Sequence, residues 1–362
     1  FALCYLRKVV IPESVTKIED AAFIENRWLE EVVIPKSVTQ IGDNVFHLCD
    51  KVVLHVQKGS YAENYAKKHS IPYVATGDAE ETAVFTFEKI DESTCALTGY
   101  NGTTAEVVVP EQNDDGLQVT KIAADTFRNR TEITSVTLPE GLVELGDNAF
   151  AGCSALATIN LPGTLTTTGE SPFDSCTSLT SIVIPASLTN IGNFMFYACT
   201  GLTSVTLPDT MRVIPDGMFD SCSGLTGISL PDGLTTISAQ AFAGTGLTGI
   251  SIPASVTTIG QCAFMDCVGL TEIVIPDTVT SMGDSVLANC SNLTSVKLSA
   301  SVAEIGRCMF QKCTALKEVE FPEGVTKLGS SIFNGCTNLT AVVIPASVTE
   351  IHDIAFVNCP NV

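Results

Sequence analysis

Residues 176–198, CTSLTSIVIPASLTNIGNFMFYA, form a unit that most of the remaining chain repeats. Counted from Pro185, large apolar residues stand six, three and one positions before it and three, six and eleven positions after it, with a glycine at the seventh. The equivalent proline recurs at 139, 162, 208, 231, 253, 276, 322 and 345, and Ser299 fills the one gap. The step is 23 residues except for one of 22 into Pro253. Repetition at this period predicts a solenoid, in which each unit forms one coil.

A single unit of 23 residues is too small to fold alone. Its six large apolar side chains contribute about 1.5–3 kcal/mol each when fully buried, whereas ordering the backbone costs about 1–2 kcal/mol per residue. Stacked units bury one another's flat faces and share backbone hydrogen bonds, so the stability of the array is a sum over neighbouring coils. We therefore predict an α/β solenoid, a curved rod with a parallel β-sheet and short helical turns.

Within a coil, the segment that ends at the proline alternates apolar and polar residues, as in residues 203–207, and is expected to be a parallel strand. A second short extended segment is expected around the Thr-x-Ile triplet that follows the proline. The glycine after this triplet permits a turn, and residues 193–198 are expected to form a single helical turn.

The pattern divides the chain into five segments around two arrays. Residues 1–56 read as the end of a first array, and 57–76 as its cap, a short helix with a capping box of Ser60 and Glu63 followed by an edge strand at 71–74. Residues 77–83 have the composition of an acidic linker. Residues 84–132 form a hairpin cap and a stretched first repeat, and 133–362 the second array. Since the chain opens and closes within repeats, we expect it to be a piece of a longer protein.

Acidic residues dominate the second part of the chain. Residues 1–76 hold nine basic and nine acidic residues, which leaves 10 basic and 31 acidic residues for the remainder and places the whole net charge of −21 there. Such a surface repels phosphate groups, so nucleic acid and anionic membranes are disfavoured as partners. The alternative role of this charge is to keep a long solenoid soluble. No apolar run approaches the ~18 residues of a membrane span.

The 14 cysteines follow the repeat. Cys4 stands three residues after Phe1, and ten others stand three residues after the repeat Phe or Leu287, at 49, 153, 176, 199, 222, 267, 290, 313, 336 and 359. Parallel side chains on stacked coils keep neighbouring Cβ atoms near ~4.8 Å, beyond the ~3.5–4.5 Å of a disulfide. We therefore predict a ladder of buried free thiols. Cys262 and Cys308 add a second thiol to two coils, but their spacing does not favour a metal site.

Other chemical signals are weak. His352 stands where glycine normally stands in the second array, and a surface variant explains it better than a catalytic base. The segment 112–116, QNDDG, offers calcium-type ligands, although an acidic turn with glycine is the commoner structure. No catalytic motif is present. We therefore expect neither an enzyme nor a bound cofactor or metal.

The repeat consensus, C-x-x-L-x-x-I-x-L-P-x-x-V-x-x-I-G-x-x-x-F-x-x-C, closely resembles the BspA-like class of leucine-rich repeats over about four-fifths of the chain. The resemblance implies a secreted or surface-anchored bacterial protein that binds host or bacterial proteins, often as an adhesin. It carries over no catalytic residue, because the motif is structural. The sequence departs from the consensus at Leu287 for Phe, Thr245 for Cys, Thr168 for Ile and Pro215 for Gly.

Outward positions of the predicted strands are mostly Thr and Ser, which offer few strong binding contacts. Charged residues gather late in the second array, with Arg307 and Lys312 on the turns beside the strands, and one aromatic pair precedes them. The candidate protein-binding residues are Glu272, Lys297, Arg307, Lys312, Lys317, Glu318 and Glu320, together with Phe194 and Tyr197. The expected partners are extracellular or cell-surface proteins, and the alternative is a passive stalk that presents another domain.

Overall fold

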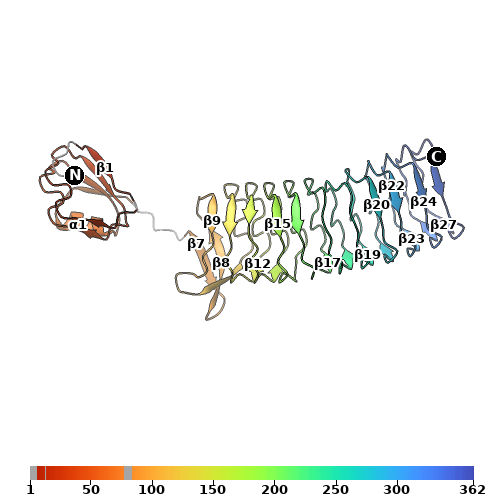
Figure 1. Ribbon diagram of the computed structural model, residues 1–362, viewed down its shortest axis with the longest axis horizontal. Coiled ribbons are helices and arrows are strands. Elements are labelled where there is room, and N and C mark those ends of the chain that lie inside the picture. Colours follow the sequence, from red (N-terminus) through yellow and green to blue (C-terminus); the bar gives the residue numbers. More distant parts are fainter. Residues whose placement is uncertain (1–5, 13, 77–83) are drawn as a thin grey trace. The chain divides into compact units, whose positions relative to one another are not determined.

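The structure is a computed structural model that describes residues 6–12, 14–76 and 84–362. The chain forms two compact units, Phe1–Val84 and Phe85–Val362, each with its own hydrophobic core. The predicted linker at 77–83 lies outside the described residues, as do Phe1 and Cys4. Both units are built from stacked coils, and in the second unit the coils follow one another in a single row (Figure 1).

The first unit consists of two parallel ladders and one helix. The main ladder has the order β1-β3-β5-β6, and the second ladder pairs β2 with β4. The elements are β1 (Lys8–Val10), β2 (Lys17–Ile18), β3 (Glu31–Ile34), β4 (Gln40–Ile41), β5 (Val53–Gln57), α1 (Tyr61–Lys68) and β6 (Tyr73–Thr76).

Helix α1 and strand β6 complete this unit after its last coil. The Glu63 amide donates to the Ser60 hydroxyl at 3.1 Å, while the Glu63 carboxylate accepts from the Gly59 amide and so reaches one residue further back than a capping box requires. Tyr65 packs edge-on against Phe46 of the last coil. Strand β6 begins two residues later than predicted, because Pro72 has no amide hydrogen to enter the ladder.

The second unit begins with the antiparallel hairpin of β7 and β8, and β8 then pairs in parallel with the first coil. Beyond it, every coil contributes to a main ladder, a second ladder, or both. The hairpin and main-ladder strands are β7 (Phe85–Lys89), β8 (Thr94–Tyr100), β9 (Glu106–Val108), β11 (Ser135–Thr137), β13 (Thr158–Ile159), β15 (Ser181–Val183), β16 (Ser204–Thr206), β20 (Glu272–Val274), β22 (Ser295–Lys297), β24 (Glu318–Glu320) and β26 (Ala341–Val343). The second-ladder strands are β10 (Gln118–Ile122), β12 (Glu144–Leu145), β14 (Thr167–Thr168), β17 (Val213–Ile214), β18 (Thr236–Ile237), β19 (Thr258–Ile259), β21 (Ser281–Met282), β23 (Glu304–Ile305), β25 (Lys327–Leu328) and β27 (Glu350–Ile351).

A third side closes each coil, and here the structure differs from the predicted helical turn. In the segment 193–198, Phe194 and Ala198 have φ angles of 57° and 54°, in the left-handed region that a right-handed helix excludes. The amides of Phe194, Phe196 and Ala198 donate to carbonyls of the next coil at 2.8–3.0 Å. These bonds between coils offset the cost of the unusual backbone, so the solenoid has three hydrogen-bonded sides and no helix at this position.

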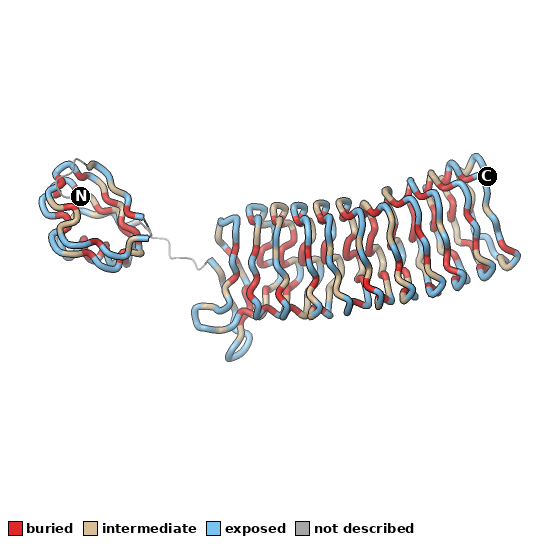
Figure 2. The backbone as a smooth tube through the Cα atoms, viewed as in Figure 1, coloured by how far each residue is buried: buried red, intermediate tan, exposed pale blue. Residues whose placement is uncertain are grey.

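The core runs the length of the unit between the three sides, and buried and exposed residues alternate along each coil (Figure 2). Its axis is a stack of repeat phenylalanines: neighbouring ring centroids from Phe127 to Phe264 lie 4.9–5.9 Å apart with nearly parallel planes. Buried Leu287 interrupts the stack before it resumes at Phe310. Neither backbone ladder is continuous: the second ladder stops between residue 190 and β17 and again between β21 and β23.

Candidate interaction surfaces

The main-strand face comprises the outward side chains of the main-ladder strands and of the equivalent segments 227–229 and 249–251. The threonines at the start of these strands already form hydrogen bonds between coils. Thr203, Thr271 and Thr294 each donate their hydroxyl to the carbonyl of the equivalent residue one coil earlier, at 3.0–3.4 Å. The hydroxyl hydrogens of these threonines are therefore not available to a partner.

The structure brings five of the predicted residues together on this face. Glu272 is the first residue of β20 and Lys297 the last residue of the adjoining strand β22. The two side chains are therefore diagonal to each other, since Glu272 pairs with Ser295 and Val274 with Lys297. Lys317, Glu318 and Glu320 lie on the next coil. All five are exposed, and none forms an ion pair with a residue that the structure describes. We call this group the charged strip.

Two further predicted residues lie elsewhere on the coils. Arg307 follows strand β23 on the second-ladder side, where it lines a crevice of about 330 Å³ with Lys327 and His352. Lys312 lies in the third-side turn segment, with a φ of 57°, beside Gly335 of the next coil. Neither residue extends the charged strip.

Phe194 and Tyr197 contact each other edge to face, with ring centroids 6.0 Å apart. Phe194 is half-buried because its ring lies against Gly217 of the next coil, where any side chain would collide with it. Tyr197 is 38% exposed. The pair therefore presents one aromatic ring to solvent on the third side, away from the charged strip.

Sequence reasoning missed a hollow of about 400 Å³ on the main-strand face. It lies where Gly227 and Gly249 replace the serines of neighbouring coils, among Ser204, Ser229 and Ser251. Neither glycine has a neighbouring atom within 4 Å of the position of an added Cβ, so the absent side chains open the surface. The next coil carries Glu272, which places the hollow beside the charged strip. The two glycines in the outward column are the signal that could have identified it.

The cysteines form the predicted ladder of free thiols. All 13 that the structure describes are unpaired, and ten of them are buried. The ladder thiols donate to the carbonyl of the repeat residue one coil earlier, as Cys199 does to Phe173 at 3.1 Å. Burial raises the pKa of Cys199 to about 12 and that of Cys267 to about 11. These groups are therefore protonated structural donors rather than nucleophiles at neutral pH.

The remaining chemical candidates have structural roles in the described part of the chain. Asn113 holds the acidic turn by accepting from the amides of Asp115 and Leu117 at 3.1 and 2.9 Å. His352 is exposed, 3.6 Å from the Glu350 carboxylate. Among residues 6–12, 14–76 and 84–362, no group of three or more His, Cys, Asp or Glu side chains is placed to hold a metal ion. The helix of this same part is too short and too polar to cross a membrane.

Stacked coils, parallel ladders and the repeated Leu, Ile, Pro and Phe positions define a leucine-rich repeat solenoid. A family model described as the BspA type leucine rich repeat region matches six copies, over residues 1–62, 120–248 and 235–362. The chain belongs to this family, which confirms the resemblance of its consensus. No curated protein matches the chain significantly.

Solved structures of bacterial leucine-rich repeat proteins are similar to the chain. A leucine rich cell surface protein from Faecalibacterium prausnitzii is 29% identical, with 77% of this chain and 92% of that chain covered and a TM-score of 0.53. A leucine-rich repeat protein from Eubacterium ventriosum is 22% identical, with 77% and 87% covered and a TM-score of 0.50. A leucine-rich repeat protein of T. pallidum is 31% identical, with 59% and 89% covered and a TM-score of 0.48.

Proposed function

We propose that the chain is a non-catalytic module of a secreted or cell-surface bacterial protein, and that it binds host or bacterial proteins in adhesion through its main-strand face. The observation that carries this proposal is the charged strip beside the Gly227–Gly249 hollow. Exposed charges without intramolecular partners, next to a concave surface, are available to a protein partner of complementary charge. The similarity to a cell surface protein of Faecalibacterium prausnitzii supports the location.

A passive stalk is the second candidate. The regularity of the main-strand face favours it, because threonine hydroxyls along much of the array are saturated by bonds between coils. A stalk needs length and stiffness, and it needs no mutation-sensitive patch.

A pair of matched double variants separates the two functions. Lys297→Glu/Lys317→Glu reverses two cations of the charged strip, and Arg307→Glu/Lys312→Glu makes the same change in net charge on the other sides of the coils. Binding of the purified chain to extracellular matrix, plasma and bacterial surface proteins is measured by surface plasmon resonance. We expect at least one saturable interaction that the first variant weakens about tenfold or more and the second leaves unchanged.

Equal loss in both variants would show that net charge, and not the main-strand face, governs binding. Absence of binding by the folded chain to every protein on the panel would favour the stalk.

A further inference from the structure

The second ladder is interrupted between two neighbouring coils that are otherwise in register. At the preceding interface, the amides of Thr189 and Asn190 donate to the Thr166 carbonyl and the Gly192 amide donates to Thr168, at 3.0–3.2 Å. No backbone hydrogen bond joins the equivalent segments 189–191 and 212–215, all of which the structure describes. The backbone groups that face across this interface are therefore left without ladder partners, although others of the same segments bond to the coils on either side, as the Asn190 carbonyl accepts from the Thr168 amide at 2.9 Å.

Pro215 prevents one of the ladder bonds at this interruption. It occupies the column of Gly192 and Ser238, whose amides donate to the preceding coil. Proline has no amide hydrogen, and its ring carbon takes the place that the hydrogen would occupy, so the bond to the Ile191 carbonyl cannot form. The ladder also opens between β21 and β23, where Gly306 occupies the same column and keeps its amide hydrogen, so a proline excludes the bond but is not required for an opening.

The interruption is confined to the second-ladder side of these two coils, because hydrogen bonds join the coils on their other two sides. On the main-ladder side the Ile184 amide donates to Thr206 at 2.9 Å, and on the third side the Phe194 amide donates to Asp216 at 2.8 Å. Between these bonds lies a crevice of about 540 Å³, which we call the proline crevice. Its volume falls within the range of small-molecule sites, about 300–1,000 Å³.

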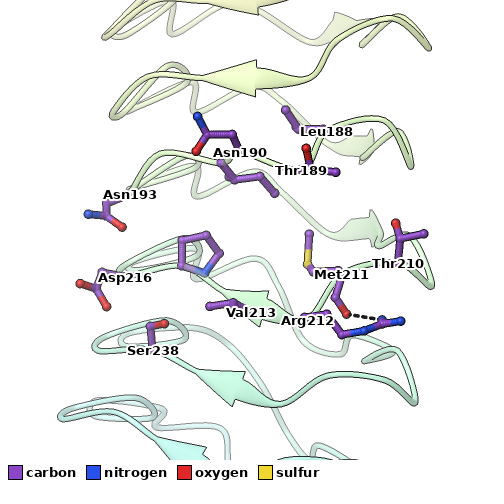
Figure 3. Close-up of a pocket in the computed structure, with 12 residues that line it drawn as sticks. Leu188, Thr189, Asn190, Asn193, Thr210, Met211, Arg212, Val213, Asp216 and Ser238 are labelled. Atoms are coloured by element: carbon purple, nitrogen blue, oxygen red, sulfur yellow. Dashed lines mark hydrogen bonds between the residues drawn. The ribbon is translucent and has the colours of Figure 1, made fainter.

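Polar side chains stand at both ends of the proline crevice (Figure 3). Asn193, Asp216 and Ser238 lie at one end, and Thr210 and Arg212 lie at the other, with Val213 between them (Figure 3). Two of these groups are held in place. The Arg212 guanidinium donates to the carbonyls of Asp209 and Met211 at 2.8 and 3.1 Å, and the Asp216 carboxylate accepts from the Ala239 amide at 2.9 Å.

We propose that the proline crevice binds a neutral sugar unit that carries an acetamido group, as part of a glycan. An acetamido group offers one N–H and one C=O, which match the unpaired carbonyl and amide groups of the interrupted ladder. The hydroxyls of the sugar match the amides, hydroxyls and charged groups at the two ends, and its apolar ring face matches Val213. This activity is additional to protein binding by the main-strand face.

Other classes of ligand fit less well. One arginine and one aspartate leave the lining without net charge, and the strong negative charge of this part of the chain opposes anions. The apolar lining is confined to a few side chains between the polar ends, which is too little to hold a lipid or an aromatic ligand.

The test uses the full chain with two disaccharides, N,N′-diacetylchitobiose and cellobiose, which differ in their acetamido groups. Ligand-observed NMR and isothermal titration calorimetry measure binding. We expect saturable binding of diacetylchitobiose and at least about tenfold weaker binding of cellobiose, as the loss of two hydrogen bonds implies.

Pro215→Gly restores the residue of the repeat consensus and the missing ladder donor, so it should close the crevice and abolish binding. Thermal stability should change little, because the regained ladder bond opposes the larger conformational entropy of the unfolded chain. Asn190→Ala/Asn193→Ala removes lining amides from a crevice that stays open and should weaken binding about tenfold. The proposal fails if diacetylchitobiose does not bind, if cellobiose binds equally well, or if Pro215→Gly binds as tightly as the unmodified chain.

Discussion

Replacing Phe219 by alanine tests whether the phenylalanine stack is the main support of the second unit. Phe219 is fully buried, and its ring centroid lies 5.9 Å from that of Phe196 and 5.5 Å from that of Phe242. The plane of its ring makes an angle of 9° with the ring plane of Phe196 and of 15° with that of Phe242. Truncation therefore removes contacts at two coil interfaces at once.

The size of the effect follows from burial. An aromatic side chain buries about 150–250 Å², which at about 25 cal/mol per Å² corresponds to about 4–6 kcal/mol. Alanine retains part of this burial and leaves a cavity, and such substitutions cost about 3–5 kcal/mol in well-packed cores. We expect Phe219→Ala to lower the free energy of unfolding of the second unit by this amount. Phe219→Leu, which copies the natural Leu287, should cost less, about 1–2 kcal/mol.

The chain contains an internal control for this measurement. Its single tryptophan, Trp28, belongs to the first unit, which has a separate core. Urea unfolding followed by Trp28 fluorescence therefore reports the first unit, whereas far-UV circular dichroism is dominated by the second. The Phe219→Ala transition should shift by circular dichroism and stay in place by fluorescence. A shift below about 1 kcal/mol, or an equal shift of both signals, would refute the proposed role of the stack.

Two further predictions concern the thiol ladder and the close approach of the coils. At pH 8, a thiol reagent should label Cys262, Cys308 and Cys359 of the described cysteines in the native chain and the ten buried ones only after unfolding. Because burial holds the pKa of Cys199 near 12 while an unfolded thiol ionises near 8.5, stability should be retained below about pH 8.5 and fall progressively as the pH rises toward 12, as urea titrations would show. Gly192→Ala should lower the free energy of unfolding by about 3 kcal/mol, because the new Cβ would collide with the Gly169 carbonyl oxygen. Gly227→Ala has open space around the new Cβ and should change it by no more than about 0.5 kcal/mol in the same assay. Equal costs would contradict the close approach of the coils at Gly192.

The third side shows why local propensity misjudged one part of the coil. The segment 193–198 has the composition of a helical turn, yet Phe194 and Ala198 adopt left-handed conformations. A left-handed backbone conformation costs about 1–2 kcal/mol for any residue other than glycine. The cost is offset by amide bonds to the next coil, which exist only when the coils are stacked. A prediction that considers one coil at a time cannot include these bonds.

The candidate protein-binding residues also show which features a single coil predicts and which depend on the folded chain. The sequence placed Glu272, Lys297, Glu318 and Glu320 on outward strand positions, because a strand alternates its faces regularly, and Lys317 next to them. It placed Arg307 and Lys312 on the turns beside the strands, but it could not say on which side of the coil each of them lies, since that depends on where the chain turns.

The 23-residue period by itself determined the coil, the parallel ladders, the buried Phe and Cys positions and the free thiols, because each follows from one unit and its identical neighbours. Only the tertiary structure decided where the ladders break and that the Gly227–Gly249 hollow and the proline crevice are open at the surface. The sequence marks both places, with two glycines and with Pro215. Whether a glycine or a proline opens the surface depends on how the coils on either side pack around it. That packing is a property of the stack rather than of any one repeat.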